Sequence, residues 1–225
     1  ASITNRSTSN VRIQNNTFTG SSNGEGAIVF DGATDVVIAN NTINNPSTSA
    51  LPNSSVETQI GRGISVINGD NIQIEGNSIT GATAEGIFVE NIGTSQNNLI
   101  ANNVVSDMRA DADSNLEGGI FLRNTKDGYI KIDGNTVKNN NLTAGVGFPT
   151  PRGVNSTDGI ELNICRGGVN LGSDAFTDGI GACSSNATLT ADITNNTVSN
   201  LQGGADGIDT NLGDNGRLNV TVSGN

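Results

Sequence analysis

The segment VVIANNTI, residues 36–43, contains the pattern that decides the fold. Large apolar residues stand at alternate positions, Val36 and Ile38, an Asn pair follows, and a polar and an apolar residue complete the unit; in most other copies the positions between the apolar residues are polar. Alternation with a period of two is typical of a strand with one buried face. The unit recurs as VRIQNNTF (11–18), IQIEGNSI (72–79), LIANNVV (99–105), IKIDGNTV (130–137) and ADITNNTV (191–198). This repetition predicts a stack of similar, strand-rich coils.

One Asn occupies the same position in each unit, just before the last strand. The less regular segments VNLGSDAF (169–176) and VTVSGN (220–225) extend the series. Equivalent residues of stacked coils lie about 4.8 Å apart, so a side-chain amide can donate to one neighbour and accept from the next. We expect an internal ladder of Asn16, Asn41, Asn77, Asn103, Asn135, Asp174, Asn196 and Asn225. These positions predict an all-β, single-stranded parallel solenoid of about eight coils.

A second pattern, Gly-Ile-x-(Val/Leu), precedes most of the Asn positions, for example GIFV at Gly86 and GIFL at Gly119. From this Gly to the next Asn position the distance is 14–18 residues, whereas the return distance varies from 5 to 24. We therefore expect one solenoid domain over residues 1–225, with variable loops at 42–62, 104–118 and 136–158. Loops that leave one corner of a solenoid often form its binding face.

Through these two patterns the whole chain resembles the right-handed parallel β-helix superfamily, in particular its pectate-lyase-like and carbohydrate-binding β-helix repeats. The right-handed winding of the coils and the cross-section of three sheets follow from this resemblance. The superfamily includes polysaccharide lyases, glycoside hydrolases, epimerases, phage tailspikes and bacterial adhesins, so the resemblance predicts a fold and leaves the function open.

The composition restricts the classes of partner. The chain carries a net charge of −11, which opposes binding to nucleic acid or to acidic polymers. No apolar run is long enough to insert into a membrane. Divalent cations and neutral glycans remain compatible with this charge. Neither end shows a cap, so we expect a segment of a longer solenoid or a rod that associates end to end.

Carboxylates gather in the last third of the sequence. In the predicted register Asp158, Asp178 and Asp206 precede three successive Gly-Ile patterns, and Glu161 and Asp209 face outward beside them. Carboxylates about 5 Å apart repel one another unless one binds a proton or all share a cation. Three interpretations stay open: solvated turn residues, a Ca²⁺ site, or a carboxylate pair of a retaining glycosidase. A second set of oxygen ligands, Asp111, Asp113 and Asn115, resembles the first half of a calcium loop.

Several absences argue against catalysis. The chain has no His, no Trp and one Tyr. It lacks the His-Gly and Arg-x-Lys motifs that enzymes resembling polygalacturonase carry, and the Tyr-Gly-x-Asp-Pro-His stretch of alginate-type epimerases. A non-enzymatic role is therefore favoured, and catalysis by Asp158, Glu161, Asp206 and Asp209 is the alternative.

Two further pairs of residues, one aromatic and one charged, are candidates for a binding face. Phe88 and Phe121 project outward from adjacent coils, where they form a sugar-binding platform or are covered by a loop. Glu90 and Arg123, one position further along, form a stacked salt bridge or part of the same binding face.

Cys165 and Cys183 fall on adjacent coils of the predicted register, within the range of a disulfide. Such a bond implies an oxidising compartment. Our leading hypothesis is an extracellular or cell-surface β-helix segment of a bacterial adhesin-like protein, whose loops bind glycan or protein. A pectate-lyase-like enzyme and a structural rod are the alternatives.

Overall fold

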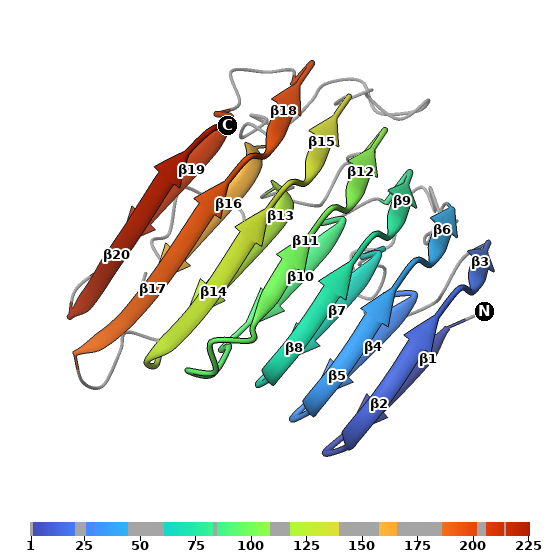
Figure 1. Ribbon diagram of the computed structural model, residues 1–225, viewed down its shortest axis with the longest axis horizontal. Coiled ribbons are helices and arrows are strands. Elements are labelled where there is room, and N and C mark those ends of the chain that lie inside the picture. Colours follow the sequence, from blue (N-terminus) through green and yellow to red (C-terminus); the bar gives the residue numbers. More distant parts are fainter. Residues whose placement is uncertain are drawn as a thin grey trace, which may run out of the picture.

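A computed structural model describes residues 2–20, 26–44, 61–82, 85–108, 118–139, 158–165, 186–201, 206–213 and 215–225. These residues form a parallel β-solenoid in which each coil contributes one strand to each of up to three sheets. Figure 1 shows the coils stacked in sequence order, from the N-terminal coil at one end to the C-terminal coil at the other. Every strand pair is parallel and joins successive coils, for example β10 with β13 and β14 with β17.

Three sheets run along the solenoid, and we name them A, B and C. Sheet A contains β1 (Ile3–Arg6), β4 (Ile28–Asp31), β7 (Ile64–Ile67), β10 (Ile87–Glu90), β13 (Gly118–Asn124), β16 (Asp158–Ile164) and β19 (Ile208–Leu212). Sheet B contains β2 (Ser9–Gln14), β5 (Thr34–Ala39), β8 (Asp70–Glu75), β11 (Leu99–Ala101), β14 (Gly128–Asp133), β17 (Ala187–Thr194) and β20 (Gly216–Ser223). Sheet C contains β3 (Thr17–Thr19), β6 (Thr42–Asn44), β9 (Ser78–Thr80), β12 (Val104–Ser106), β15 (Thr136–Lys138) and β18 (Thr197–Ser199).

The alternating sequence pattern produces a thin apolar core. In β14, Ile130 and Ile132 are buried in the common hydrophobic cluster. The residues that alternate with them, Tyr129, Lys131 and Asp133, are only partly buried and lie on the outer face. The predicted apolar column that follows the ladder is also present: Ile43, Ile79, Val105 and Val137 are fully buried and pair in register. Stacking therefore makes the core continuous although each coil supplies few apolar side chains.

The Asn ladder is confirmed at seven of its eight predicted positions. Each Nδ2 donates to the Oδ1 of the next ladder residue at 2.9–3.1 Å, in the order Asn16, Asn41, Asn77, Asn103, Asn135, Asn196 and Asn225. The backbone N–H of each donor residue reaches the same Oδ1 at 2.8–3.0 Å. From Asn41 onward, Nδ2 also donates to a carbonyl of the preceding coil, such as Ile74 for Asn103 at 2.8 Å. The ladder thus satisfies its own buried polar groups.

A left-handed backbone conformation precedes every ladder residue. These preceding residues have φ between +54° and +66° in the first six coils and +70° in the last: Asn15, Asn40, Gly76, Asn102, Gly134, Asn195 and Gly224. Asn and Gly are the residues that adopt this conformation at low cost. The repeated Asn-Asn and Gly-Asn pairs of the sequence are therefore a corner, with one residue for the turn and one for the ladder.

The described residues form seven coils, one fewer than the spacing predicted. Asn135 bonds directly to Asn196, and β14 and β15 pair directly with β17 and β18. The described ladder therefore continues from Asn135 to Asn196 without Asp174, which itself lies outside the described residues. Residues 166–185, between β16 and β17 in the sequence, lie outside the described residues.

The predicted variable loops begin or end in strands. β6, β12 and β15 occupy the first residues of the ranges 42–62, 104–118 and 136–158, and β16 begins at Asp158. The central parts of these ranges, residues 45–60, 109–117 and 140–157, lie outside the described residues. All three follow a strand of sheet C and precede a strand of sheet A, at one corner of the coil.

The ladder generates a prediction about stability. Asn103→Leu removes the acceptor of two Asn77 N–H groups and a donor to the carbonyl of Ile74. We expect a loss of about 1–3 kcal/mol in the free energy of unfolding, because buried polar groups lose their partners. Urea denaturation followed by circular dichroism measures it. Asn16→Leu, at the exposed end of the ladder, is the matched control and is expected to have a smaller effect; equal effects would contradict the role of burial.

Candidate cation site on the outer face of sheet A

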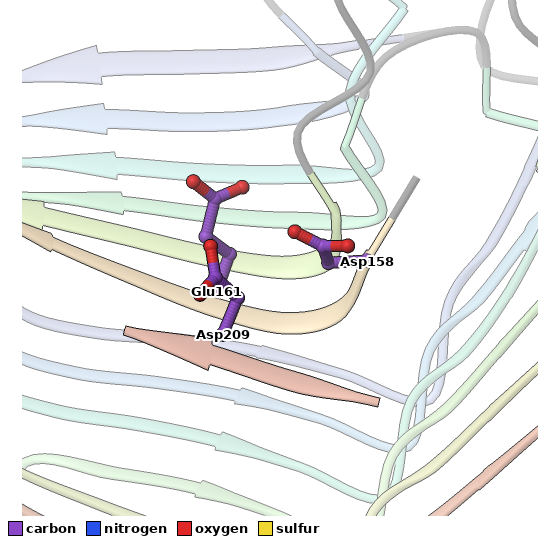
Figure 2. Close-up of side chains that lie close together, drawn as sticks. All are labelled: Asp158, Glu161 and Asp209. Carbon is purple, nitrogen blue, oxygen red and sulfur yellow. The ribbon is translucent and has the colours of Figure 1, made fainter. Parts of the chain in front are cut away.

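Three carboxylates converge on the outer face of sheet A near its C-terminal end. Glu161 in β16 and Asp209 in β19 are register partners, and Asp158 begins β16. Each of the three offers an oxygen, and these oxygens all lie within 4.8 Å of one another. Figure 2 shows Glu161 and Asp209 projecting from neighbouring strands toward the same side, with Asp158 further back along β16. We call Asp158, Glu161 and Asp209 the acidic cluster.

The acidic cluster is shielded from solvent. Asp158 and Glu161 are each 6% exposed, and Asp209 is partly buried. The backbone N–H of Asp206 donates to Oδ1 of Asp158 at 2.7 Å. Nδ2 of Asn211 donates to Asp209 at 2.5 Å and to Glu161 at 3.3 Å. Close carboxylates with restricted access to water favour either protonation or a shared cation.

A buried amide oxygen lies on the same face. Asn163 follows Glu161 by two residues on β16 and is the register partner of Asn211. The residue is 4% exposed, and its Oδ1 has no hydrogen-bond partner among the residues that the structure describes. A buried acceptor without a partner is costly, and an amide oxygen is a common ligand of Ca²⁺. Sequence reasoning missed Asn163, because only burial reveals that its oxygen is unsatisfied.

The other predicted ligands do not join the acidic cluster in the described structure. The side chain of Asp206 is exposed, and this residue contributes its backbone N–H instead. Asp178, Asp111, Asp113 and Asn115 lie outside the described residues. Because β16 pairs directly with β19, Asp158 and Asp206 belong to adjacent coils with no intervening coil for Asp178.

Phe88 and Phe121 stack on the same outer face but are enclosed. The ring centroids are 5.8 Å apart, and the residues are 0% and 1% exposed. The guanidinium carbons of Arg62 and Arg123 lie 3.7 Å and 5.0 Å from the Phe88 ring centroid. A sugar-stacking platform needs an open ring face, so this arrangement favours the covered alternative for the aromatic pair.

Two ion pairs border the aromatic pair. Arg123 contacts Glu90 at 2.8 Å, which confirms the stacked salt bridge between neighbouring coils. Arg62 contacts Glu85 at 2.5 Å with both side chains largely buried. Each arginine thus combines a carboxylate partner with an aromatic face, an arrangement that the planar guanidinium suits.

The outer face of sheet B carries two groups with shifted pKa values. Burial raises the pKa of Tyr129, and its hydrogen bond to Asp192 together with the negative charge there adds to the shift. The pKa of Asp133 is lowered to about 2, first by the hydroxyl of Thr194 and then by Lys131 and Asn195. These contacts hold the carboxylate of Asp133 in its charged form.

Cys165 directly follows β16. It has a left-handed backbone conformation, with φ of +52°, and is fully buried. Its expected partner, Cys183, lies outside the described residues. The disulfide therefore stays a prediction.

A family model described as "Right handed beta helix region" matches residues 1–225 of the chain. No curated protein and no solved structure matches the chain. Within the described residues, no helix has the length and apolar character needed to cross a membrane.

The low pKa of Asp133 predicts how stability depends on pH. A carboxyl whose folded-state pKa lies below its usual 3.8 stabilises the fold above that pH, and this contribution is lost as the pH falls toward about 2. Asp133→Asn is therefore expected to lower the free energy of unfolding at pH 7, by less than about 1 kcal/mol because the site is partly open to solvent. The difference from the parent protein should shrink as the pH falls through about 2 and vanish below it in urea denaturation. An equal difference at both pH values would contradict this linkage.

Proposed function

The chain belongs to the right-handed β-helix family, and we propose that it is a calcium-binding, extracellular β-helix segment of a bacterial surface protein. In this proposal the acidic cluster holds Ca²⁺, and the loops between sheets C and A bind glycan or protein. One observation carries the cation proposal: three carboxylate oxygens within 4.8 Å of one another on a face where two of the side chains are 6% exposed.

The ligand chemistry favours Ca²⁺ among common metal ions. Ca²⁺ takes six to eight oxygen ligands, often from carboxylates that bind with both oxygens and from side-chain amides. Asp158, Glu161 and Asp209 provide carboxylates, and the unpartnered Oδ1 of Asn163 lies on the same strand face. Zinc prefers His and Cys ligands, and the chain has no His.

A bound cation also explains why acids occupy this position. The register places Glu161 directly beside Asp209, and neighbouring carboxylates repel one another unless a proton or a cation offsets their charge. A divalent ion compensates both charges at once and gives Asn163 a partner. Ca²⁺ is abundant outside cells, which agrees with the extracellular location that we propose.

A glycoside hydrolase is the second candidate function. The observation in its favour is the proximity of Glu161 and Asp209, since retaining glycosidases place two carboxyl groups about 5–5.5 Å apart. We prefer cation binding to glycoside hydrolysis for two reasons. The acidic cluster is enclosed, and the sequence lacks the catalytic motifs of the enzymes that it resembles. Hydrolysis of a glycan that stops in Glu161→Gln would favour the enzyme instead.

The calcium proposal predicts a stabilisation by the ion. Millimolar Ca²⁺ is expected to raise the melting temperature of the parent protein, and EDTA to reverse the rise, because an ion that binds only the folded state stabilises it. The double variant Glu161→Gln, Asp209→Asn should lose this response. Differential scanning calorimetry measures the shift, and isothermal titration calorimetry gives the stoichiometry.

Asp206→Asn is the matched control for this experiment. Its carboxyl is exposed and lies outside the acidic cluster, so the response to Ca²⁺ should be retained. Mg²⁺ is expected to have a weaker effect, because it demands a smaller octahedral shell. No response of the parent protein to Ca²⁺, or an equal response in the double variant, would refute the site.

The extracellular location is supported by the two cysteines of the chain. The described part contains no free cysteine, and we propose a bond between Cys165 and Cys183, which stand between β16 and β17 in the sequence. Peptide mapping by mass spectrometry without reduction should recover the two residues in one cross-linked peptide. Reduction should lower the melting temperature, because the bond restricts the unfolded chain. Recovery of both as free thiols from oxidised protein would disprove the bond.

A further inference from the structure

The outer face of sheet C carries a regular grid of hydroxyl side chains. Each of its six strands has three residues, an inward middle residue and an outward residue on either side. Thr or Ser occupies nine of the twelve outward positions. The first outward row contains Thr17, Thr42, Ser78, Val104, Thr136 and Thr197. The second outward row contains Thr19, Asn44, Thr80, Ser106, Lys138 and Ser199. We call these two rows the hydroxyl grid.

The strand register gives the hydroxyl grid two fixed spacings. Each strand of sheet C pairs in register with the next, so neighbours within a row lie about 4.8 Å apart. The two outward residues of one strand lie about 6.6 Å apart, because a strand rises about 3.3 Å per residue. Figure 1 shows the strands of sheet C in sequence order, from β3 to β18. The rows run across the strands, so the two spacings are nearly perpendicular.

The Asn ladder fixes the hydroxyl grid from the inside. The first outward residue of a strand directly follows a ladder residue, as Thr42 follows Asn41 and Ser78 follows Asn77. The N–H of Ser78 donates to the carbonyl of Asn41 at 2.9 Å, and the equivalent bond recurs in the other coils. Threonine is β-branched, which restricts its side-chain rotamers. The positions of the hydroxyls are therefore set before a ligand binds.

The hydroxyls of the grid are available to a ligand. The contact between Thr80 and Ser106, at 3.4 Å, is the one side-chain hydrogen bond of the grid among the described residues. The outward residues of β3 are exposed, and those of β6, β9 and β15 are partly exposed. Within the grid only Ser106 is buried.

The hydroxyl grid is almost free of charge. Lys138 is its one charged residue, although the chain has a net charge of −11. The outward rows of sheet B, by contrast, include Arg12, Glu75, Lys131 and Asp192. A surface with so little charge offers no electrostatic attraction to an ionic partner. Each threonine presents a methyl and a hydroxyl that donates one hydrogen bond and accepts up to two.

We propose that the hydroxyl grid binds the surface of ice. Ice is an uncharged lattice in which every water molecule donates and accepts hydrogen bonds, and the oxygens on its prism faces repeat along two perpendicular directions. These two repeats are similar to the strand spacing and to the spacing of alternate residues on a strand. Hydroxyls of the grid can occupy positions of lattice water, while the methyls fill the hollows between them. Because the grid is preformed, binding costs little side-chain entropy.

The experiment measures thermal hysteresis, the gap between the melting point of an ice crystal and the temperature at which it grows again. Protein adsorbed on ice forces the growing surface to curve between the bound molecules, which lowers the freezing point. In a nanolitre osmometer the parent protein is expected to show this gap and to shape the crystal into facets. Bovine serum albumin at equal concentration serves as the protein without ice affinity.

Substitutions at the centre of the hydroxyl grid test the surface itself. Ser78→Tyr with Thr80→Tyr places two rings on β9 and is expected to abolish the hysteresis, because the rings hold the ice surface away from the grid. Thr221→Tyr with Ser223→Tyr is the matched control, since it has the same spacing on exposed positions of β20 in sheet B. The control should retain the hysteresis, and circular dichroism melts check the fold of both variants.

A third variant is expected to gain activity. Asn44→Thr with Lys138→Thr replaces two interruptions of the second row by threonine and should increase the hysteresis. A misfolded protein would not produce such a gain, so this result does not depend on the stability of the tyrosine variants.

The proposal is overturned if the parent protein shows no hysteresis, if the β9 variant retains it, or if the β20 variant loses it. A dimer in sedimentation velocity that dissociates in the β9 variant would also overturn it, because a second copy would then cover the grid. The Glu161→Gln, Asp209→Asn variant should retain the hysteresis, since the acidic cluster lies on sheet A. Failure of the calcium proposal therefore leaves this test unaffected.

Discussion

The buried amide ladder is the interaction on which the rest of the structure depends. Each interior ladder Asn accepts two N–H groups from one coil and donates to another residue of the ladder and to a carbonyl, so a coil that shifts by one residue loses all four contacts at once. The residue before it must turn the chain with positive φ, and a Cβ at Gly134 would lie 2.7 Å from Oδ1 of Asn102. Turn, ladder and apolar column therefore fix one register for sheets B and C.

The sequence was sufficient to predict the ladder where the residue chemistry and the spacing agree. It failed at residues 169–176, where the apolar spacing fits but the ladder position holds Asp174. An ionised carboxylate has acceptors only, whereas each interior ladder Asn donates from Nδ2 to an amide oxygen and to a carbonyl. An Asp in this position would leave two buried acceptors facing it without a donor. The requirement for donors, applied together with the spacing, argues against Asp174 as a ladder residue.

That single error decides which acids meet on sheet A. With an additional coil between β16 and β19, Glu161 and Asp209 would be separated by one intervening coil. Without it, β16 and β19 are neighbours, and Glu161 and Asp209 become register partners. Acidic residues on this face could be predicted from their spacing after each Gly, but their pairing depends on contacts between residues about fifty positions apart. The unpartnered oxygen of Asn163 depends on burial, which no local pattern encodes.

The internal ladder leaves the outer faces free to diverge. Because register and core are set by inward residues, an outward substitution changes little beyond its immediate neighbours in the adjacent coils. Sheet A buries its outward phenylalanines and carboxylates, while sheet B leaves an open groove over Val37 and Ala39. A solenoid whose coils were held by outward contacts would lose stability with each such change, so the position of the ladder inside the coil is what permits function outside it.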